Sequence, residues 1–432
     1  MGEALLIYLG LLLLLFMIGM PVGFALGATA IVAGAYQFGV TIPFDMFAQR
    51  MVSGINNFTI LAVPFFIFAA RVMNTSGVTN RLFGFADVCV GWLRGGLGHT
   101  NILASMLFAG MSGAAVSDAA GLGMIEIQAM KDNGYDEYFS ASVTCASSIV
   151  GPIIPPSIPM VFYAVQGGVS VGALFMGGIV PGVIMGVAMM ILVFFFAKTK
   201  CPAPRKLPSM REFLSSARSA IIPLLCPIII MGGIYSGYFT PTEAAAIAAV
   251  YALVVGIFVY REITPQKLHE IIRLSIRDTV SMGIIVACTY PYAWLITTSG
   301  LPQTFSSWVL SVTQNPTVVL LLINVFLLIV GCFLEGCSAI LLLTPILLPV
   351  VQALGVHPVQ FGLIMVLNLM IGLITPPFGL VLFVTSRVAK LQLGKLIKAT
   401  IPFLVPLIVT LLLITLIPEL VMWLPGVAGM IR

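Results

Sequence analysis

Long apolar runs separated by short polar turns follow one another along the whole chain. Uncharged stretches of about 20 residues, the length of helix that crosses a bilayer, recur from one end to the other. The strict alternation typical of a membrane β-barrel is absent from the sequence. The pattern therefore predicts an all-α polytopic membrane protein. We expect its first spans at 4–19, 22–39 and 56–74, with a loop between the second and the third.

Two regions depart from this pattern before residue 138. Residues 75–98 are mixed in polarity and fit an amphipathic helix lying in the membrane interface. Residues 97–131 are apolar but are interrupted at MSGAAVSD, which leaves two arms of about 14 residues where a span needs about 20. We therefore expect a re-entrant hairpin there. A span over 171–197 and a basic linker over 198–218 follow further along the chain.

Adjacent prolines interrupt two long apolar segments, at GPIIPPS (Gly151–Ser157) and at GLITPPF (Gly372–Phe378). Proline lacks a backbone N–H and clashes with the preceding helical turn, so a helix cannot run through either pair. In hydrocarbon each freed carbonyl must be satisfied by protein, water or an ion. We therefore expect discontinuous helices over 138–166 and 359–384, with both breaks inside the protein.

The second half of the chain repeats the order of the first. A shift of 221 positions, the separation of Gly151 and Gly372, also places Ser117 on Ser338 and one proline pair on the other. Each repeat is expected to hold five spans and one hairpin, and an odd number of crossings inverts the second repeat relative to the first. The repeats are expected at 1–197 and 219–428, with the second hairpin at 317–352.

Charge is sparse and indicates topology. Only 8% of the residues are charged and 60% are hydrophobic, with a net charge of +5 and a mean hydropathy of +1.12. If the amino terminus lies outside, all of the 20 lysines and arginines except Arg50 and Arg432 fall on the cytoplasmic side, as the positive-inside rule requires. We therefore expect both termini outside, the first hairpin entering from the cytoplasm and the second from outside. The positive charge is not interpreted as nucleic-acid binding.

Oxygen-bearing residues gather at both breaks and both hairpin tips. At the first they are Ser112, Ser117, Asp118, Ser147 and Gly151, and at the second they are Glu335, Ser338, Asn368, Gly372 and Thr375. Hydroxyl, amide and carbonyl oxygens with little fixed charge can replace the hydration shell of an alkali cation. Two equivalent sets predict two cation sites, which we expect to hold Na⁺.

Several of these residues have a structural alternative. A serine or threonine in a membrane helix often bonds the carbonyl four residues earlier. Asp118 and Glu335 are candidates for helix caps, for ion or substrate contacts, or for proton coupling, and Glu243 is expected in the first turn of a helix. No arginine lies close to either break in sequence, and Arg387 is expected to reach the cytoplasmic interface.

Five motifs together resemble the large membrane subunit of the tripartite ATP-independent periplasmic (TRAP) transporters. They occur in the expected order at Ser112–Gly123, Gly151–Ser157, Tyr238–Ala246, Leu334–Val350 and Gly372–Gly379. The resemblance covers essentially the whole chain. It implies a fold like the ion-transporter superfamily and an elevator mechanism in the bacterial inner membrane. Gly336-Cys337 departs from the family pattern at the second tip.

The resemblance also implies partners and site residues. A small four-helix membrane subunit and a periplasmic solute-binding protein would assist uptake of an organic acid anion, such as a dicarboxylate, sialic acid or a sugar acid. One Na⁺ would be held by Ser112, Ser117, Ser147, Gly151 and Pro155, and the other by Glu335, Ser338, Asn368, Gly372 and Thr375. Asp118, Pro156, Ser157 and Pro377 are expected to contact the substrate.

Three other functions compete with this one. A stand-alone Na⁺/dicarboxylate symporter of similar fold needs no soluble partner, and an ion channel can be built on two re-entrant hairpins. An intramembrane enzyme is the weakest rival because no nucleophile, base or metal-ligand spacing is grouped in the sequence. No phosphate-binding loop is present either, so the chain has no nucleotide motor of its own.

Overall fold

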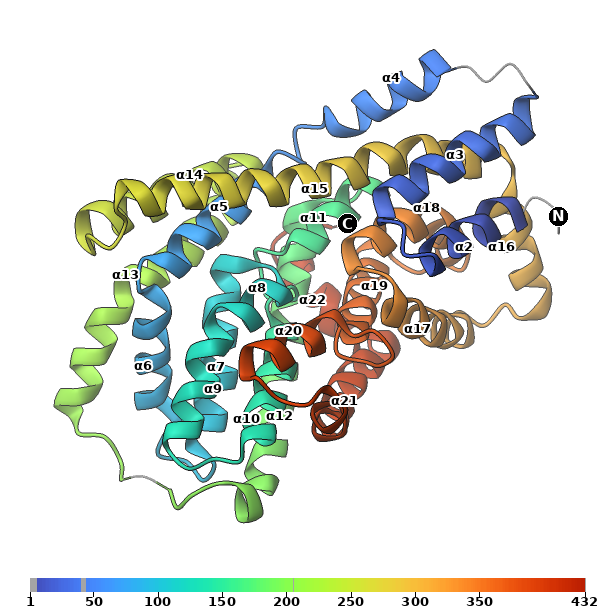
Figure 1. The fold of residues 1–432 in the computed structure, drawn as a ribbon. Helices are drawn as coiled ribbons and strands as arrows, with labels where there is room; N and C mark the ends of the chain where they lie inside the picture. Colours follow the sequence, from blue (N-terminus) through green and yellow to red (C-terminus); the bar gives the residue numbers. More distant parts are fainter. Residues whose placement is uncertain (1–5, 40–43, 205, 432) are drawn as a thin grey trace.

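The computed structural model describes residues 6–39, 44–204 and 206–431, and within them all regular structure is helical (Figure 1). Residues 4, 5 and 43 of the predicted first span and loop, together with Arg205 and Arg432, lie outside this description. Seven of the described helices are long and apolar enough to cross a membrane. These helices cover 171–198, 210–235, 241–259, 265–298, 316–333, 336–353 and 393–416, and the pair 316–333 and 336–353 makes up the expected second hairpin.

The amino-terminal region contains shorter helices than its apolar runs suggest. They are η1 (Leu6–Gly10), α2 (Leu11–Met17), α3 (Val22–Phe38), α4 (Phe44–Ile55), α5 (Ala62–Thr75) and α6 (Val78–Val90). The loop expected between the second and third spans is wrong, because α4 occupies it. Phe47 and Gly54 are buried on α4, where Phe47 meets Trp294 edge to face, so an apolar face ties α4 to the long helix α15 (Pro265–Thr298).

The segment 97–131 folds as two arms that contact each other. The first arm is α7 (Gly96–Ser112), and the second is α8 (Ala115–Ala120) followed by α9 (Leu122–Asp132). The turn between them contains Gly113 with φ 61°, a conformation that favours glycine. A side chain at Gly113 would also collide with the carbonyl of Pro156. The tip therefore closes tightly against the first proline break.

Both helices that carry proline pairs are interrupted where the sequence predicts. The first consists of α10 (Glu137–Ser147), η2 (Ser148–Val150) and α11 (Ile158–Gly167), and the second of α19 (Pro358–Gly372) and α20 (Leu380–Ala389). Both proline pairs contain a cis peptide bond. The first break is buried almost completely, whereas residues 376–378 of the second are exposed.

The remaining helices complete the second half of the chain. They are α12 (Val171–Lys200), α13 (Met210–Tyr235), α14 (Pro241–Val254), η3 (Val255–Val259), α16 (Leu301–Val312), α17 (Pro316–Phe333), α18 (Gly336–Ala353), α21 (Leu393–Leu416) and α22 (Glu419–Val427). Only residues 201–209 separate α12 from α13, so the predicted linker 198–218 is helical at both ends. Ser209 caps α13 in a capping box with Glu212, which explains why that helix begins so early.

The breaks and hairpins pack crosswise in the centre of the molecule (Figure 1). The second part of the first broken helix, α11, contacts α18, and the second part of the other, α20, contacts α8. Within each half, α10 contacts α7 and α19 contacts α17. Helices α3, α4 and α5 lie along α15, outside this central group. The two broken helices and the hairpins therefore lie where both halves meet.

Candidate functional site

A chain of buried hydrogen bonds joins the first hairpin to the first broken helix. Ser105 Oγ donates to Ser147 Oγ at 3.0 Å, and Ser147 Oγ lies 2.7 Å from Asn101 Oδ1. Asn101 Nδ2 donates to Thr144 Oγ1 at 2.6 Å. All four side chains are buried. The structure thus places Ser147 in a polar network that includes Asn101 and Ser105, neither of which the sequence analysis singled out.

Asp118 lies where the hairpin tip meets the break. Its carboxylate accepts a short hydrogen bond from Ser112 Oγ, while its other oxygen, Oδ2, is buried without a partner. A side chain at Gly151 would collide with that Oδ2. Asp118 does not cap α8, so the capping alternative is wrong for this residue. The fold has brought Ser112, Asp118 and Gly151 together around an oxygen that has no protein donor.

The second break has a comparable buried network. Asn368 Nδ2 donates to Asn324 Oδ1 at 2.9 Å and to the Ile364 carbonyl at 2.8 Å, and Asn324 Nδ2 donates to Thr415 Oγ1 at 2.9 Å. Asn368 Oδ1 is buried without a partner. A side chain at Gly372 would collide with the backbone of Gly331 on α17. Each break therefore carries one buried oxygen that the described protein does not satisfy.

The acidic residue of the second tip is a helix cap. Glu335 accepts from the backbone N–H groups of Cys337 at 3.0 Å and Ser338 at 2.9 Å, and from Ser338 Oγ at 2.9 Å. Thr375 Oγ1 donates to the Ile371 carbonyl at 2.8 Å. For Glu335 and Thr375 the structural alternatives are therefore present. Glu243 caps its helix with Thr240, as expected for a first-turn residue.

The remaining predicted residues differ in their surroundings. Ser157 is buried and caps α11, accepting from Met160 N at 3.3 Å and donating to the Pro152 carbonyl. Pro155 and Pro156 are buried, whereas Pro377 is exposed. Ser117 is half-buried and lines a cavity next to the first hairpin tip. Asp118, Pro156 and Ser157 are not part of the lining of that cavity.

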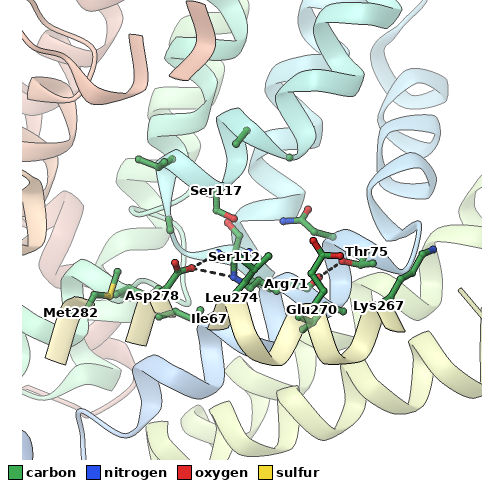
Figure 2. Close-up of a pocket in the computed structure, with 18 residues that line it drawn as sticks. Ile67, Arg71, Thr75, Ser112, Ser117, Lys267, Glu270, Leu274, Asp278 and Met282 are labelled. Atoms are coloured by element: carbon green, nitrogen blue, oxygen red, sulfur yellow. Dashed lines mark hydrogen bonds and ion pairs between the residues drawn. The ribbon is translucent and has the colours of Figure 1, made fainter. Parts of the chain in front are cut away.

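The cavity has a volume of about 600 Å³ and lies between α5, the first hairpin tip and α15 (Figure 2). Ser112 and Ser117 line it from the tip. Polar residues of the other two helices line the opposite side; they are Arg71, Asn74, Thr75, Lys267, Glu270 and Asp278. Arg71 Nε donates to Asp278 Oδ2 at 3.1 Å, and its Nη2 also contacts that oxygen. Arg71 therefore shares a cavity with the first hairpin tip, although no arginine is close to either break in sequence.

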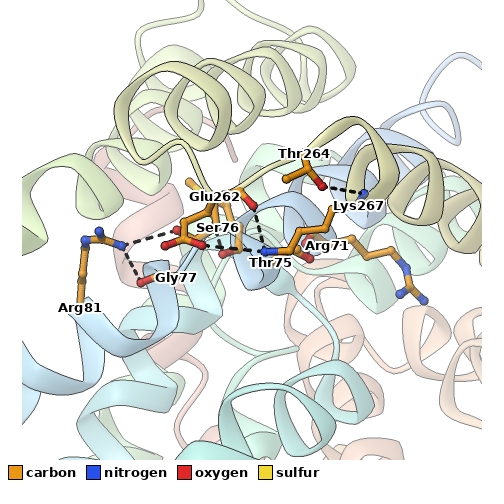
Figure 3. Close-up of polar contacts among 9 residues, drawn as sticks. Arg71, Thr75, Ser76, Gly77, Arg81, Glu262, Thr264 and Lys267 are labelled. Carbon is orange, nitrogen blue, oxygen red and sulfur yellow. Dashed lines mark hydrogen bonds and ion pairs between the residues drawn. The ribbon is translucent and has the colours of Figure 1, made fainter.

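Lys267, the other cation in this lining, is held at the edge (Figure 3). Its Nζ donates to the Glu262 carbonyl at 3.0 Å and lies 3.8 Å from the Glu262 carboxylate. Nearby, Arg81 donates to the Gly77 carbonyl at 2.9 Å and stacks on Tyr260 with its guanidinium carbon 3.7 Å from the ring centroid. The stacking of Arg81 on Tyr260 joins the start of α6 to the segment before α15.

Two further features were missed or misplaced by the sequence analysis. Glu126 on α9 is buried, and its Oε1 has no partner in the described structure. The signal was present in the sequence, since Glu126 is a lone acid inside an apolar arm. A second cavity, of about 460 Å³, is lined by both Glu335 and Arg387, and the expectation that Arg387 reaches the cytoplasmic interface stays a prediction. Among the described residues no His, Cys, Asp and Glu cluster suits a transition metal.

These features define a polytopic membrane transporter with polar sites at two helix breaks. The sequence profile of the family "Tripartite ATP-independent periplasmic transporter, DctM component" matches residues 9–420. The chain is 44% identical to the sialic acid TRAP transporter large permease SiaM of Vibrio cholerae, over 94% of this chain and 95% of that one. It is 43% identical to the C4-dicarboxylate large permease DctM of Pseudomonas aeruginosa, over 89% and 90% of the two chains.

The chain belongs to this family as a TRAP transporter large permease. It is also 38% identical to the 2,3-diketo-L-gulonate large permease YiaN of Escherichia coli, over 97% of this chain and 98% of that one. The crystal structure of the Alcanivorax borkumensis YdaH transporter has a similar fold, with a TM-score of 0.62 over 91% of this chain and 96% of that one at 13% identity. The relatives are permeases rather than enzymes.

Proposed function

We propose that this permease uses Na⁺ to import an organic acid anion across the bacterial inner membrane. The observation that carries the proposal is the pair of buried, unpartnered oxygens, Asp118 Oδ2 at one break and Asn368 Oδ1 at the other. Burying a polar oxygen without a donor is costly, and a cation bound there would remove the cost. The surrounding hydroxyl, amide and carbonyl oxygens suit Na⁺, and one site at each break gives two ions.

Two ions supply enough energy for accumulation. At 100 mV each transferred charge contributes about 2.3 kcal/mol. Two Na⁺ entering with a monoanion carry one net charge inward, and a tenfold Na⁺ gradient contributes about 1.4 kcal/mol for each ion. The sum is about 5 kcal/mol, which supports more than a thousandfold accumulation. ATP is not needed in this scheme.

The crosswise packing of the two halves supports an elevator mechanism. In this proposal residues 1–197 and 219–428 are inverted repeats. The hairpins and broken helices move together as the transport unit, and α5, α14 and α15 stay fixed. The cavity reaches Lys267 and Glu270, on the side that the positive-inside rule assigns to the cytoplasm, which supports an inward-open arrangement. Both termini then face the periplasm.

The relatives' names support the substrate class and the partners. SiaM, DctM and YiaN are named for sialic acid, C4-dicarboxylates and 2,3-diketo-L-gulonate, all of which are organic acids. The sialic acid TRAP permease SiaT of Haemophilus influenzae is longer, since this chain spans 68% of it. We propose that a separate small membrane subunit supplies the corresponding part here and that a periplasmic binding protein delivers the anion.

Reconstitution tests this proposal. Proteoliposomes containing the chain with its small subunit are supplied with the binding protein and labelled succinate or N-acetylneuraminate. We expect uptake that requires an inward Na⁺ gradient and increases with an inside-negative potential. Uptake that persists without Na⁺, or that ignores the potential, contradicts the coupling. Full-rate uptake without the binding protein favours the stand-alone symporter, and single-channel currents in a planar bilayer favour a channel.

A further inference from the structure

The cavity between α5, α15 and the first hairpin tip contains a guanidinium that can receive a carboxylate. Arg71 and Lys267 are the cations in its described lining. Lys267 is engaged with Glu262 at the edge of the cavity, whereas Arg71 lies opposite Ser112 and Ser117 (Figure 2). Arginine presents a planar fork of five N–H donors that matches a carboxylate, so it suits an organic acid better than an ammonium does.

The ion pair of Arg71 leaves part of this fork free to exchange partners. Nε and Nη2 both meet one oxygen of Asp278, and the side chains of Arg71 and Asp278 are 30% and 38% exposed. An ion pair that water reaches is weak, because hydration competes with it. A second carboxylate arriving in the cavity can therefore displace Asp278 at little cost. Both residues belong to the helices that the proposed mechanism keeps fixed.

We propose that Arg71 binds the carboxylate of the transported anion and that Asp278 occupies Arg71 when the cavity is empty. The inference rests on the proposed function and adds the substrate-recognition residue to it. It places the anion between α5 and the first tip, within reach of the Ser112 and Ser117 hydroxyls. Asp278 then acts as a competitor, so its removal strengthens binding while removal of Arg71 weakens it.

Opposite effects at the two members of the pair form the test. The purified complex is titrated in saturating Na⁺ with succinate and with N-acetylneuraminate, and binding is followed by equilibrium dialysis. We expect Arg71→Gln to weaken binding about tenfold or more, because a hydrogen-bonded charge pair is lost. Asp278→Asn should tighten binding a few-fold, and Arg71→Lys should fall between wild type and Arg71→Gln.

Matched variants distinguish carboxylate binding by Arg71 from a general effect of positive charge and from a loss of folding. Arg277→Gln removes an exposed cation next to Asp278 on the same helix but outside the cavity lining, and it should bind as wild type does. Arg387→Gln tests the cation of the second cavity and should also bind normally. Thermal midpoints identify any variant that fails to fold. If Arg71→Gln fails to fold, the Asp278→Asn variant tests the inference by itself: tighter binding supports it and weaker binding contradicts it.

A second readout compares each acid with its methyl ester. Wild type should prefer the acid, and Arg71→Gln should lose most of this preference, a change that a purely structural arginine would not produce. The inference is overturned if both members of the pair weaken binding equally, if Arg71→Gln binds normally, or if Arg387→Gln alone loses binding. If Arg71→Gln binds the acid normally and Na⁺-driven uptake is intact, this inference is wrong but the proposed function is not affected. If the wild-type protein binds no organic acid, both this inference and the proposed function are contradicted.

Discussion

At the scale of residues, two buried oxygen atoms support the proposed ion sites. Asp118 Oδ2 lies between the first hairpin tip and the first break, Asn368 Oδ1 lies on the second broken helix, and both are buried without a donor. Neighbouring side chains at these breaks, such as Ser147 and Asn324, have complete sets of partners. An open buried oxygen beside each helix break supports the proposal of a ligand at both places.

Asn368→Ala should remove one cation site. The substitution deletes the open oxygen and the hydrogen bond to Asn324, so we expect the Na⁺ dependence of uptake to become less cooperative and its midpoint to rise. The measurement is uptake into proteoliposomes as a function of external Na⁺. Thr410→Ala is the control, because this buried hydroxyl bonds only the Pro406 carbonyl of its own helix. An unchanged Na⁺ curve for Asn368→Ala would show that Asn368 only packs.

Gly151→Ala should disable the other site. Its methyl group would meet Asp118 Oδ2, where the ion is proposed to bind, and the surrounding break is buried on all sides. We expect strong loss of Na⁺-driven uptake, measured beside the thermal midpoint. Gly232→Ala on α13 is the matched control, since the space around that glycine is open. Normal Na⁺ coupling in Gly151→Ala would argue against an ion at this break.

At the scale of elements, local chemistry explains several helix boundaries. Ser157 caps α11, Glu335 caps α18 and a Thr240–Glu243 box starts α14. These devices are readable from sequence, and so are the breaks at the proline pairs. Helix α4 was missed because Asp45 and Arg50 suggested a loop, although its apolar residues recur at helical spacing.

Glu335→Ala should weaken the start of α18. The carboxylate satisfies the Cys337 and Ser338 backbone donors, so its loss is expected to cost about 1 kcal/mol and to lower the thermal midpoint of the complex. Glu335→Asp, which keeps a short acceptor at the cap, should retain much of the stability. If Glu335→Ala changes Na⁺ affinity without changing the thermal midpoint, the residue is an ion ligand rather than a cap.

At the scale of the molecule, the two halves pack against each other around the helix breaks. Hairpin segment α8 contacts α20 of the other half, and α18 contacts α11. The long cavity between α5, α15 and the first tip also joins segments from both halves (Figure 2). The residues around each break come from one half, whereas both halves line the cavity, and this contact between halves fits the proposed elevator between inverted repeats.

The proposed topology is testable with reporter fusions. Alkaline phosphatase fused after the last residue should be active, because the carboxyl terminus is proposed to lie in the periplasm. The same reporter fused after Ser209, in the segment between α12 and α13, should be inactive, and a green fluorescent protein there should fluoresce. The reverse pattern would invert the orientation and move the described cavity to the outside.

The sequence by itself determined the membrane class, the helical fold, both helix breaks and the family. These follow from hydropathy, from proline chemistry and from motifs that are each contiguous in the chain. It also indicated Ser147, Gly151 and Asn368, because breaks and spacing are local properties. The placement of Ser117 on the cavity and of Asp118 outside its lining was decided only by packing.

Tertiary structure alone decided which distant residues share a site. Arg71 reaches the first hairpin tip, and Asn101 and Asn324 reach the broken helices, through contacts between segments far apart in sequence. No local sequence pattern predicts these long-range contacts, because the close packing of whole helices determines them. The same reason hid the Arg71–Asp278 pair, whose members are separated by 207 positions and belong to different halves.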